Sequence, residues 1–218
     1  MRYSFVADHF AYLAIVGLVV LGVAAAARWR VHVALGASVL AILGVLTARQ
    51  TLAYRDLRTL WTDTLAKNPE CWMAHNNLGG LLLQERAFDD AIGHLREALR
   101  LKPDNPQAEN DLAVALDMQG RSADALPHYA RAVALDPDYA NAHYNYAGAL
   151  RALGRLDEAI DHYRQALRSR PDLPDAHAGL GTTLATLGRK SEAIAELEAA
   201  LQLHPDDPET RRTLDHLR

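Results

Sequence analysis

The first fifty residues consist largely of two apolar runs that carry no formal charge. Residues 11–27 read AYLAIVGLVVLGVAAAA and residues 31–47 read VHVALGASVLAILGVLT, with only RWR between them. Both runs are apolar on every side, which is typical of a buried or membrane-spanning helix rather than a surface helix. Each is at the short end of the roughly 17–25 residues that a helix needs to cross a bilayer. We therefore expect residues 1–50 to form a transmembrane helical hairpin, with helices at about 10–27 and 31–48.

Two other interpretations of this segment remain open. A signal peptide would place Arg2 before an apolar core and a cleavage site in the four alanines that end the first run. Asp8 and His9 argue against it, because the region before such a core is normally basic. A pair of core helices in a globular domain is less favoured, because helices that are apolar all round need a large partner surface.

The placement of Lys and Arg predicts the orientation of this hairpin. The turn between the two runs holds Arg28 and Arg30, with Trp29 as an interfacial anchor, and the positive-inside tendency places such a turn in the cytoplasm. Both ends of the chain would then lie outside. Three arginines after the second run favour the opposite orientation: Arg49, Arg55 and Arg58.

Beyond residue 50 the pattern changes to a repeat with a period of 34 residues. Within each copy two apolar-patterned helices are joined by a turn, which reads QGRSADAL, LGRLDEAI and LGRKSEAI in the last three copies. Glycine ends the first helix there, where a positive φ suits it. The first copy has Arg86 in this place, so we expect its turn to be strained or differently shaped. The prolines that mark the period are Pro69, Pro103, Pro137, Pro171 and Pro205.

Large and small apolar residues also recur at fixed positions of the copies. One small position holds Gly79, Ala113, Ala147 and Gly181, and one large position holds Leu95, Tyr129, Tyr163 and Leu197. Such alternation lets stacked helix pairs reach a dense core. Pro127 falls in the first turns of a second helix and removes a backbone donor, so we expect it to bend or delay that helix.

These features together resemble the tetratricopeptide repeat, a helix–turn–helix unit of 34 residues. The resemblance implies an all-α fold in which a transmembrane helical hairpin is followed by an α-solenoid, a superhelix of stacked helix–turn–helix repeats. The expected order is the membrane hairpin (1–50), a half-repeat cap (51–71), four repeats (72–105, 106–139, 140–173 and 174–207) and a C-terminal capping helix (208–218).

Charge narrows the classes of partner. The net charge is −4, and residues 1–50 carry +3, so the remainder carries −7. A mildly acidic body argues against nucleic acid, because phosphate binding needs a clustered basic face. The single cysteine, Cys71, excludes an intramolecular disulfide.

Neither the histidines nor the acidic pairs predict a catalytic or metal site. His75, His143 and His177 share one position of the first helix, and we expect them to pack beside its small residues. A second position, held by His94, His128 and His162, is expected to face outward. Cys71 has no partner cysteine, and the sequence contains no His-x-x-x-His motif with a glutamate between the two histidines. A structural zinc site is therefore not supported. We find no phosphate-binding loop and no nucleophile elbow, and expect neither a cofactor nor enzymatic activity in this chain.

The first helices offer a candidate binding surface. In tetratricopeptide repeats these helices line the concave face, and Asn77 and Asn145 resemble an asparagine row that holds the backbone of an extended peptide. An amide both donates and accepts hydrogen bonds, so it binds main chain without regard to sequence. Asp111 and Gly179 interrupt the row. The alternative is a solvated polar face used only as scaffold. The residues expected in the groove are Asn76, Asn77, Asn110, Asp111, Asn141, Tyr144, Asn145 and Asp175.

A second resemblance concerns residues 3–78. The segment ADHFAYL and the entry YRDLRTLWTDTLAKNPECWMAHNNLG are similar to the last membrane helices and repeat entry of polytopic tetratricopeptide membrane proteins related to protein O-mannosyltransferases. The resemblance implies repeats that face away from the cytoplasm. The many further membrane helices of that family, and its acidic catalytic residue, have no match here.

These observations predict an integral membrane protein, of the bacterial inner membrane, with its repeats in the periplasm. We expect a scaffold that binds a protein or an extended peptide on its concave face. The alternative is a C-terminal fragment or accessory subunit of a membrane glycosyltransferase, which would dock protein substrates for a catalytic partner.

Overall fold

The computed structural model describes residue 18, residues 39–47 and residues 56–218. The chain divides into two compact units, Met1–Asp56 and Leu57–Arg218. In the first unit, residues 39–47 are helical and expose the apolar side chains of Ile42, Val45 and Leu46. Most of the predicted hairpin, with helices at about 10–27 and 31–48, lies outside the described residues. Among the residues that are described, no helix is both long and apolar enough to cross a membrane.

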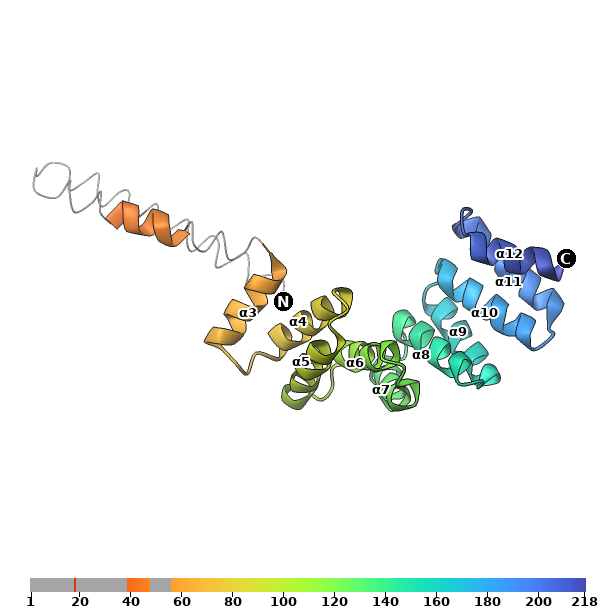
Figure 1. Ribbon diagram of the computed structural model, residues 1–218, viewed down its shortest axis with the longest axis horizontal. Coiled ribbons are helices and arrows are strands. Elements are labelled where there is room, and N and C mark those ends of the chain that lie inside the picture. The colour runs from red at the N-terminus through yellow and green to blue at the C-terminus, as the bar shows by residue number, and fades with distance from the viewer. Residues whose placement is uncertain (1–17, 19–38, 48–55) are drawn as a thin grey trace, which may run out of the picture. The chain divides into compact units, whose positions relative to one another are not determined.

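The second unit is a series of antiparallel helix pairs (Figure 1). The two helices of a pair contact each other more closely than they contact the next pair, so each pair is a packing unit. A single helix precedes the pairs and another follows them. In chain order the helices are α3 (Leu57–Lys67), α4 (Trp72–Gln84), α5 (Phe88–Leu101), α6 (Pro106–Met118), α7 (Ser122–Leu135), α8 (Ala140–Ala152), α9 (Leu156–Ser169), α10 (Pro174–Thr186), α11 (Lys190–Leu203) and α12 (Pro208–Leu217).

The turn inside each pair is the same in all four copies. In the second copy Arg121 N–H donates to Leu116 C=O and Gly120 N–H donates to Asp117 C=O, the two bonds of a Schellman motif. In the first copy Ala87 and Arg86 donate to Leu82 and Leu83 in the same way. The φ angle of Arg86 is +61°, close to the +74° to +76° of the three glycines at this position. The expectation of a differently shaped turn was therefore wrong, and the strain of a left-handed backbone rests on Arg86 itself.

The core of each pair is made by the alternation of large and small residues. Leu95 packs so closely on Gly79 that an added Cβ would lie 2.6 Å from Leu95 Cγ, and Leu197 packs on Gly181 in the same manner. In the two middle copies the large residue is a tyrosine, Tyr129 or Tyr163, and both are fully buried. The close approach of the two helices explains why these positions accept only glycine or alanine.

Pro127 lies within α7 without delaying it. The helix begins at Ser122, where the other second helices begin relative to their turns, and runs on to Leu135. The expected delay was therefore wrong, and the alternative, a bend at Pro127, stays a prediction. Proline removes one backbone donor from the helix. Because Pro127 is exposed, its ring displaces no neighbouring residue.

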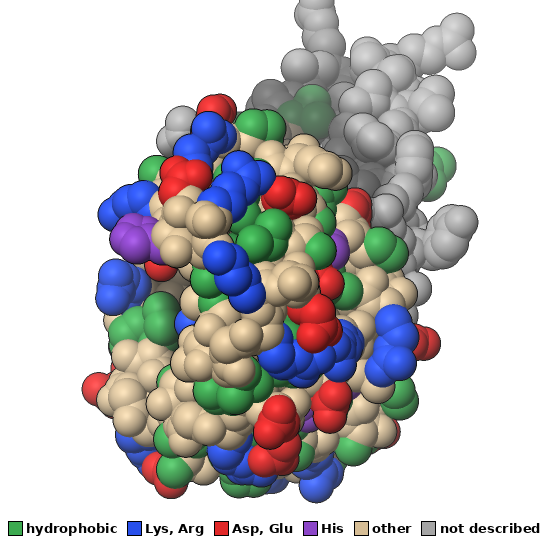
Figure 2. Space-filling model, turned by 90° about the vertical axis from the view of Figure 1, so that its right-hand side faces the viewer, with side chains coloured by type: hydrophobic (Ala, Val, Ile, Leu, Met, Phe, Trp, Pro, Cys, Tyr) green, Lys and Arg blue, Asp and Glu red, His purple; other side chains and the backbone are tan. Residues whose placement is uncertain are grey.

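Single helices cover both ends of the stack. Trp61 and Leu65 of α3 pack against the core of the first pair, and Leu214 of α12 is buried against the last. The outer side of α12 is charged, with exposed Glu209, Arg211, Arg212 and Asp215. Figure 2 shows the side of the molecule that lies at the right of Figure 1, where Lys and Arg are interspersed with Asp and Glu. A charged outer helix is what the end of a helical stack requires in water.

Candidate peptide-binding groove

The first helices of successive pairs form one continuous face. Helix α4 contacts α6, α6 contacts α8, and α8 contacts α10, whereas in the described part of the chain α5 does not contact α7 and α7 does not contact α9. Helices that touch lie on the inner side of a curved stack, and helices that are splayed apart lie on the outer side. The inner face is therefore built by α4, α6, α8 and α10, which carry the residues expected in the groove.

A cavity of about 490 Å³ opens at the α3 end of this face. Its apolar wall comes from α3, with Leu57 and Trp61, and from Leu81 of α4. Its polar side comes from α4 and α6, with Asn77, Gly80, Gln107 and Asp111. An apolar wall facing a few polar groups is the usual composition of a binding pocket. Asn77 is half-buried and makes no side-chain hydrogen bond within residues 56–218, so both ends of its amide are open to a ligand.

Asp111 lies on the polar side of the cavity. Its Oδ1 accepts a 3.0 Å hydrogen bond from Asn110 Nδ2. Its Oδ2 points toward Gly80, where an added Cβ would lie 3.7 Å away. Burial raises the pKa of the Asp111 carboxyl above its usual range, while hydrogen bonds from Asn110 and Gln107 oppose that rise. The carboxylate is thus held by amides and not by a positive charge.

A hydrogen-bonded chain continues from Asp111 into the next repeat. Asn145 Nδ2 donates to Asn110 Oδ1 over 3.0 Å, and Asn110 in turn donates to Asp111. Asn110 is buried at 4 % exposure, so it positions its two neighbours and is closed to a ligand. The Oδ1 of Asn145 accepts no hydrogen bond within the described residues. The structure therefore brings three of the predicted residues together, in the order Asn145, Asn110, Asp111.

Asn76 is also buried and has a structural role. Its Oδ1 accepts a 3.3 Å hydrogen bond from Nδ2 of Asn105, the residue that precedes the first helix of the next repeat. Asn105 caps α6 by accepting from the Ala108 amide, also over 3.3 Å. Asn76 and Asn105 thus couple the first two repeats. Asn76 and Asn77 both line the cavity, but Asn77 is the one whose amide makes no hydrogen bond within the described residues.

The far half of the inner face is arranged differently. Tyr144 is half-buried with its ring centroid 6.1 Å from that of Tyr163, and burial raises its pKa, with the Asp175 carboxylate adding to the rise. Asp175 itself is exposed. Asn141 is exposed and accepts a 2.6 Å hydrogen bond from Arg170 Nη2, which ties it to the inter-repeat turn. Tyr144 and Asp175 therefore lie within electrostatic reach of each other, and Asn141 belongs to a separate contact.

The structure also explains the break in the asparagine row at Gly179. A Cβ at this position would lie 2.6 Å from Tyr163 Cζ, because the Tyr163 ring reaches between α8 and α10 to the inner face. Tyr163 is 2 % exposed and cannot move aside. Leu57, Trp61 and Leu81 were not among the residues expected in the groove, although all three line the cavity. The signal for this wall was the pair of apolar residues Leu57 and Trp61, four positions apart in the helix before the first repeat.

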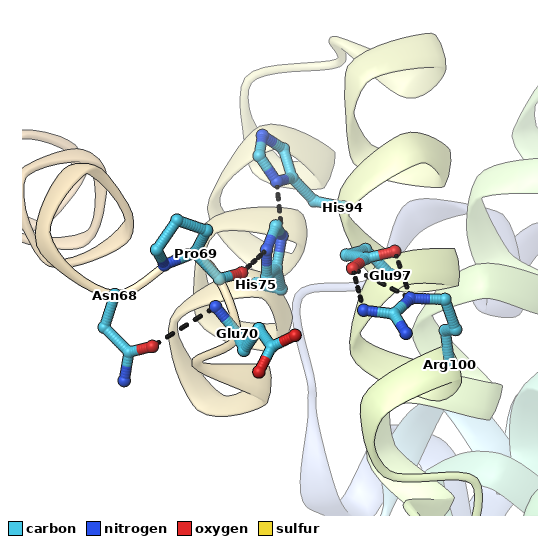
Figure 3. Close-up of polar contacts among 7 residues, drawn as sticks. All are labelled: Asn68, Pro69, Glu70, His75, His94, Glu97 and Arg100. Atoms are coloured by element: carbon cyan, nitrogen blue, oxygen red, sulfur yellow. Dashed lines mark hydrogen bonds and ion pairs between the residues drawn. The ribbon is translucent and has the colours of Figure 1, made fainter.

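The histidines form pairs within a repeat, not across repeats. His75 Nε2 donates to the Pro69 carbonyl over 3.0 Å, which leaves His75 Nδ1 as an acceptor, and His94 Nδ1 lies 2.9 Å from it (Figure 3). His143 repeats this arrangement with the Pro137 carbonyl and His162. The expectation that His94 and His162 face outward was therefore wrong, since both turn toward the first helix.

In the second and fourth repeats a glutamate takes the place of one histidine of the pair. His128 Nδ1 lies 2.7 Å from Glu109 Oε2, and His177 Nδ1 lies 2.7 Å from Glu196 Oε2. His128 is thus a third residue that turns inward against expectation. Across residues 56–218 and the shorter described segments, no group of three or more metal-ligating side chains gathers. The pairs join the two helices of each repeat, and the sequence hides them because the partners are 19 residues apart.

Comparisons with known proteins agree with this architecture. The sequence matches the tetratricopeptide repeat family over residues 54–106 and 110–174, and a second tetratricopeptide repeat family over residues 150–214. Among solved structures, the chain is similar to YrrB, described as a TPR protein with an unusual peptide-binding site, at 22% identity and a TM-score of 0.63, covering 79% of this chain and 89% of that one. These matches confirm the predicted all-α tetratricopeptide solenoid.

Two further structures show the same fold. The crystal structure of MamA matches at 24% identity with a TM-score of 0.62, covering 68% of this chain and 86% of that chain. The PilF protein of Pseudomonas aeruginosa matches at 26% identity with a TM-score of 0.63, covering 68% of each chain. The comparison with curated proteins found no match.

Proposed function

This chain belongs to the tetratricopeptide repeat family, and from that premise we propose that it is a membrane-anchored scaffold that binds an extended peptide or protein segment on its inner face. The observation that carries the proposal is the cavity between α3, α4 and α6. There an amide with no partner in the repeats, Asn77, faces an apolar wall that contains Trp61. This combination suits a chain that offers main-chain polar groups and apolar side chains together.

Two further features support an extended ligand. Asn77 and Asn145 lie on the same face, two repeats apart, and each leaves an amide oxygen for a ligand donor. The curved face between them is continuous through α6. YrrB, one of the similar structures, is described as having an unusual peptide-binding site, and we carry peptide binding to this chain as part of the proposal.

The test is selection from a random library of displayed 12-residue peptides against the purified full chain. The triple variant Asn77→Ala, Tyr144→Ala, Asn145→Ala should bind the selected peptides at least about tenfold more weakly, because each substitution removes a polar or aromatic contact worth about 1 kcal/mol. The control variant Arg96→Ala, Asp161→Ala alters exposed residues of α5 and α9 on the outer face and should bind as the wild type does. Equal binding by the triple variant and the wild type would contradict groove binding.

For anchoring and location, we propose that residues 1–50 form the membrane hairpin and that the repeats lie in the periplasm of a bacterial inner membrane. The apolar runs 11–27 and 31–47 and the arginines of the turn between them support this proposal. Intact cells treated with protease from the periplasmic side should lose the repeats. Repeats that become sensitive only after the inner membrane is broken would contradict the orientation.

A second candidate function follows from the ADHFAYL segment. Its resemblance to tetratricopeptide membrane proteins related to protein O-mannosyltransferases favours an accessory subunit that docks protein substrates for a catalytic membrane partner. Co-expression with candidate membrane subunits, followed by an assay with a lipid-linked sugar, tests this role. Transfer that needs both chains would support it, and transfer by the catalytic chain alone at an equal rate would contradict it.

A further inference from the structure

We infer that the peptide bound on the inner face carries a basic side chain, lysine or arginine, which enters the cavity beside Asp111. The inference rests on the proposed function and adds the chemical class of the ligand. The cavity carries a negative charge, one side of the Asp111 carboxylate is accessible, and the opposite wall is apolar.

The cavity has an unbalanced charge. Asp111 is the one acidic residue among the described residues that line it, and no Lys, Arg or His lines it there. Within residues 56–218 no basic side chain forms an ion pair with Asp111. Asp111 also acts on Tyr139, where burial, with smaller contributions from the Asp111 and Asp136 carboxylates, raises the pKa of the phenol to about 12. A half-buried carboxylate without a counter-charge favours a cationic ligand group over an anionic one.

The geometry leaves one side of the carboxylate accessible. Oδ1 is used by Asn110 Nδ2, and the exposed Gln107 amide also lies near the carboxylate. Oδ2 faces Gly80, which has no side chain to cover it. Gly80 also lines the cavity, so the open space reaches the carboxylate. An ammonium or guanidinium group in the cavity can donate to Oδ2 without displacing the hydrogen bond that Oδ1 already accepts.

The opposite wall suits the rest of a basic side chain. Leu57, Trp61 and Leu81 offer apolar surface to the methylene stem of lysine or arginine, which packs along such surface while its charged end stays polar. The indole of Trp61 also attracts a cation over its face. The same kind of contact already occurs in this repeat, where Lys102 Nζ lies 4.2 Å from the centroid of the Trp72 ring.

The selectivity is confined to this end of the inner face. Farther along, Arg170 donates to Asn141, and Arg151 lies close enough to Tyr144 and Tyr163 to lower the pKa of both phenols against the effect of burial. The positive charges there offset the Asp175 carboxylate. One basic position in the ligand, rather than a uniformly basic peptide, is therefore the expected preference.

Two matched variants test the inference on the full chain with the random displayed 12-residue library. Asp111→Asn removes the charge but keeps an Oδ1 acceptor for Asn110. Asp206→Asn removes the same charge from an exposed turn at the other end of the repeats. Peptides selected on the wild type should be enriched in Lys or Arg at one position, and the best of them should bind Asp111→Asn about tenfold more weakly and Asp206→Asn unchanged.

A double-mutant cycle places the basic residue beside Asp111. Replacing it by glutamine in the selected peptide should weaken binding to the wild type about tenfold and should leave binding to Asp111→Asn almost unchanged. Selected peptides without basic enrichment, or equal binding by Asp111→Asn and wild type, would overturn the inference and leave the proposed function standing. A wild-type selection that yields no binding peptide would overturn the proposed function, and this inference with it.

Discussion

His75 Nδ1 and His94 Nδ1 lie 2.9 Å apart, and only one of these two nitrogens carries a proton. The Pro69 carbonyl fixes the arrangement by accepting from His75 Nε2, so the proton between the rings belongs to His94. His143 and His162 form the same pair two repeats later. A proton added to His94 goes to Nε2 and keeps this contact, so the cost of that first charge comes from its burial. Only a pair with both rings protonated would place two N–H groups face to face.

Unfolding experiments against pH test this relationship. Burial lowers the pKa of His94, and the neighbouring His75 lowers it further while Asp90 opposes the shift. Burial likewise lowers the pKa of His143 and His162. The unfolded chain then binds more protons than the folded chain below about pH 6.5, so stability should fall as the pH drops from 7.5 to 5.5. Urea titrations at the two pH values measure the loss.

A glutamine variant separates the histidine pairs from other titrating groups. In His94→Gln, His162→Gln the amide N–H can still donate to the first-helix histidine, but neither new residue can be protonated. The loss of stability between pH 7.5 and 5.5 should therefore be smaller than in the wild type. An unchanged loss would show that the pairs do not cause it.

Two glycines beside the Tyr163 ring should respond in opposite directions to alanine. A Cβ at Gly179 would meet Tyr163 Cζ at 2.6 Å, whereas one at Gly148 would lie 4.0 Å from Tyr163 Oη. Gly179→Ala should destabilise the protein by about 1–3 kcal/mol through overpacking. Gly148→Ala should be neutral or stabilise by about 0.5–1 kcal/mol, because glycine disfavours the helix interior. Chemical denaturation measures both, and a Gly179→Ala variant as stable as Gly148→Ala would refute the close packing.

Arg86 offers a stabilising substitution. It occupies the left-handed position that Gly120, Gly154 and Gly188 hold in the other repeats. Arg86→Gly should therefore stabilise the chain by about 1 kcal/mol, the approximate cost of this backbone conformation for a residue with a Cβ. The matched reverse change, Gly154→Ala, should destabilise by a similar amount. Thermal unfolding of both variants provides the measurement, and a loss of stability in Arg86→Gly would contradict the assignment of strain to Arg86.

The repeat architecture could be predicted because the residues that determine the turn and the core of each unit lie within that unit. The turn requires a positive φ, and glycine recurs there at 34-residue spacing. The large residue at one position packs on the small residue at another position of the same unit. Neither feature depends on contacts between distant units. The turn of Arg86 was misjudged because the backbone bonds of its Schellman motif impose the conformation on a residue that does not favour it.

The groove could be predicted only in part. The first helices were correctly placed on one face, but whether an asparagine on it is open or buried depends on contacts between repeats. Asn76 is closed by Asn105, and Gly179 is dictated by Tyr163 from the helix before it. The histidine pairs were also missed. Aligning the repeats at their 34-residue period places equivalent residues together, but the two partners of a pair are 19 residues apart within one repeat. The membrane hairpin and the site residues as a set stay predictions.

The most direct measurement of ligand binding on the inner face is photo-crosslinking with a selected peptide. A benzophenone amino acid would replace Gln84 or Gln107, two exposed residues that line the cavity, and in separate variants Arg96 or Asp161, two exposed residues of the second helices. Covalent adducts should form from positions 84 and 107 and not from positions 96 and 161. Adducts from positions 96 and 161, with none from positions 84 and 107, would contradict the central claim that the inner face binds the peptide.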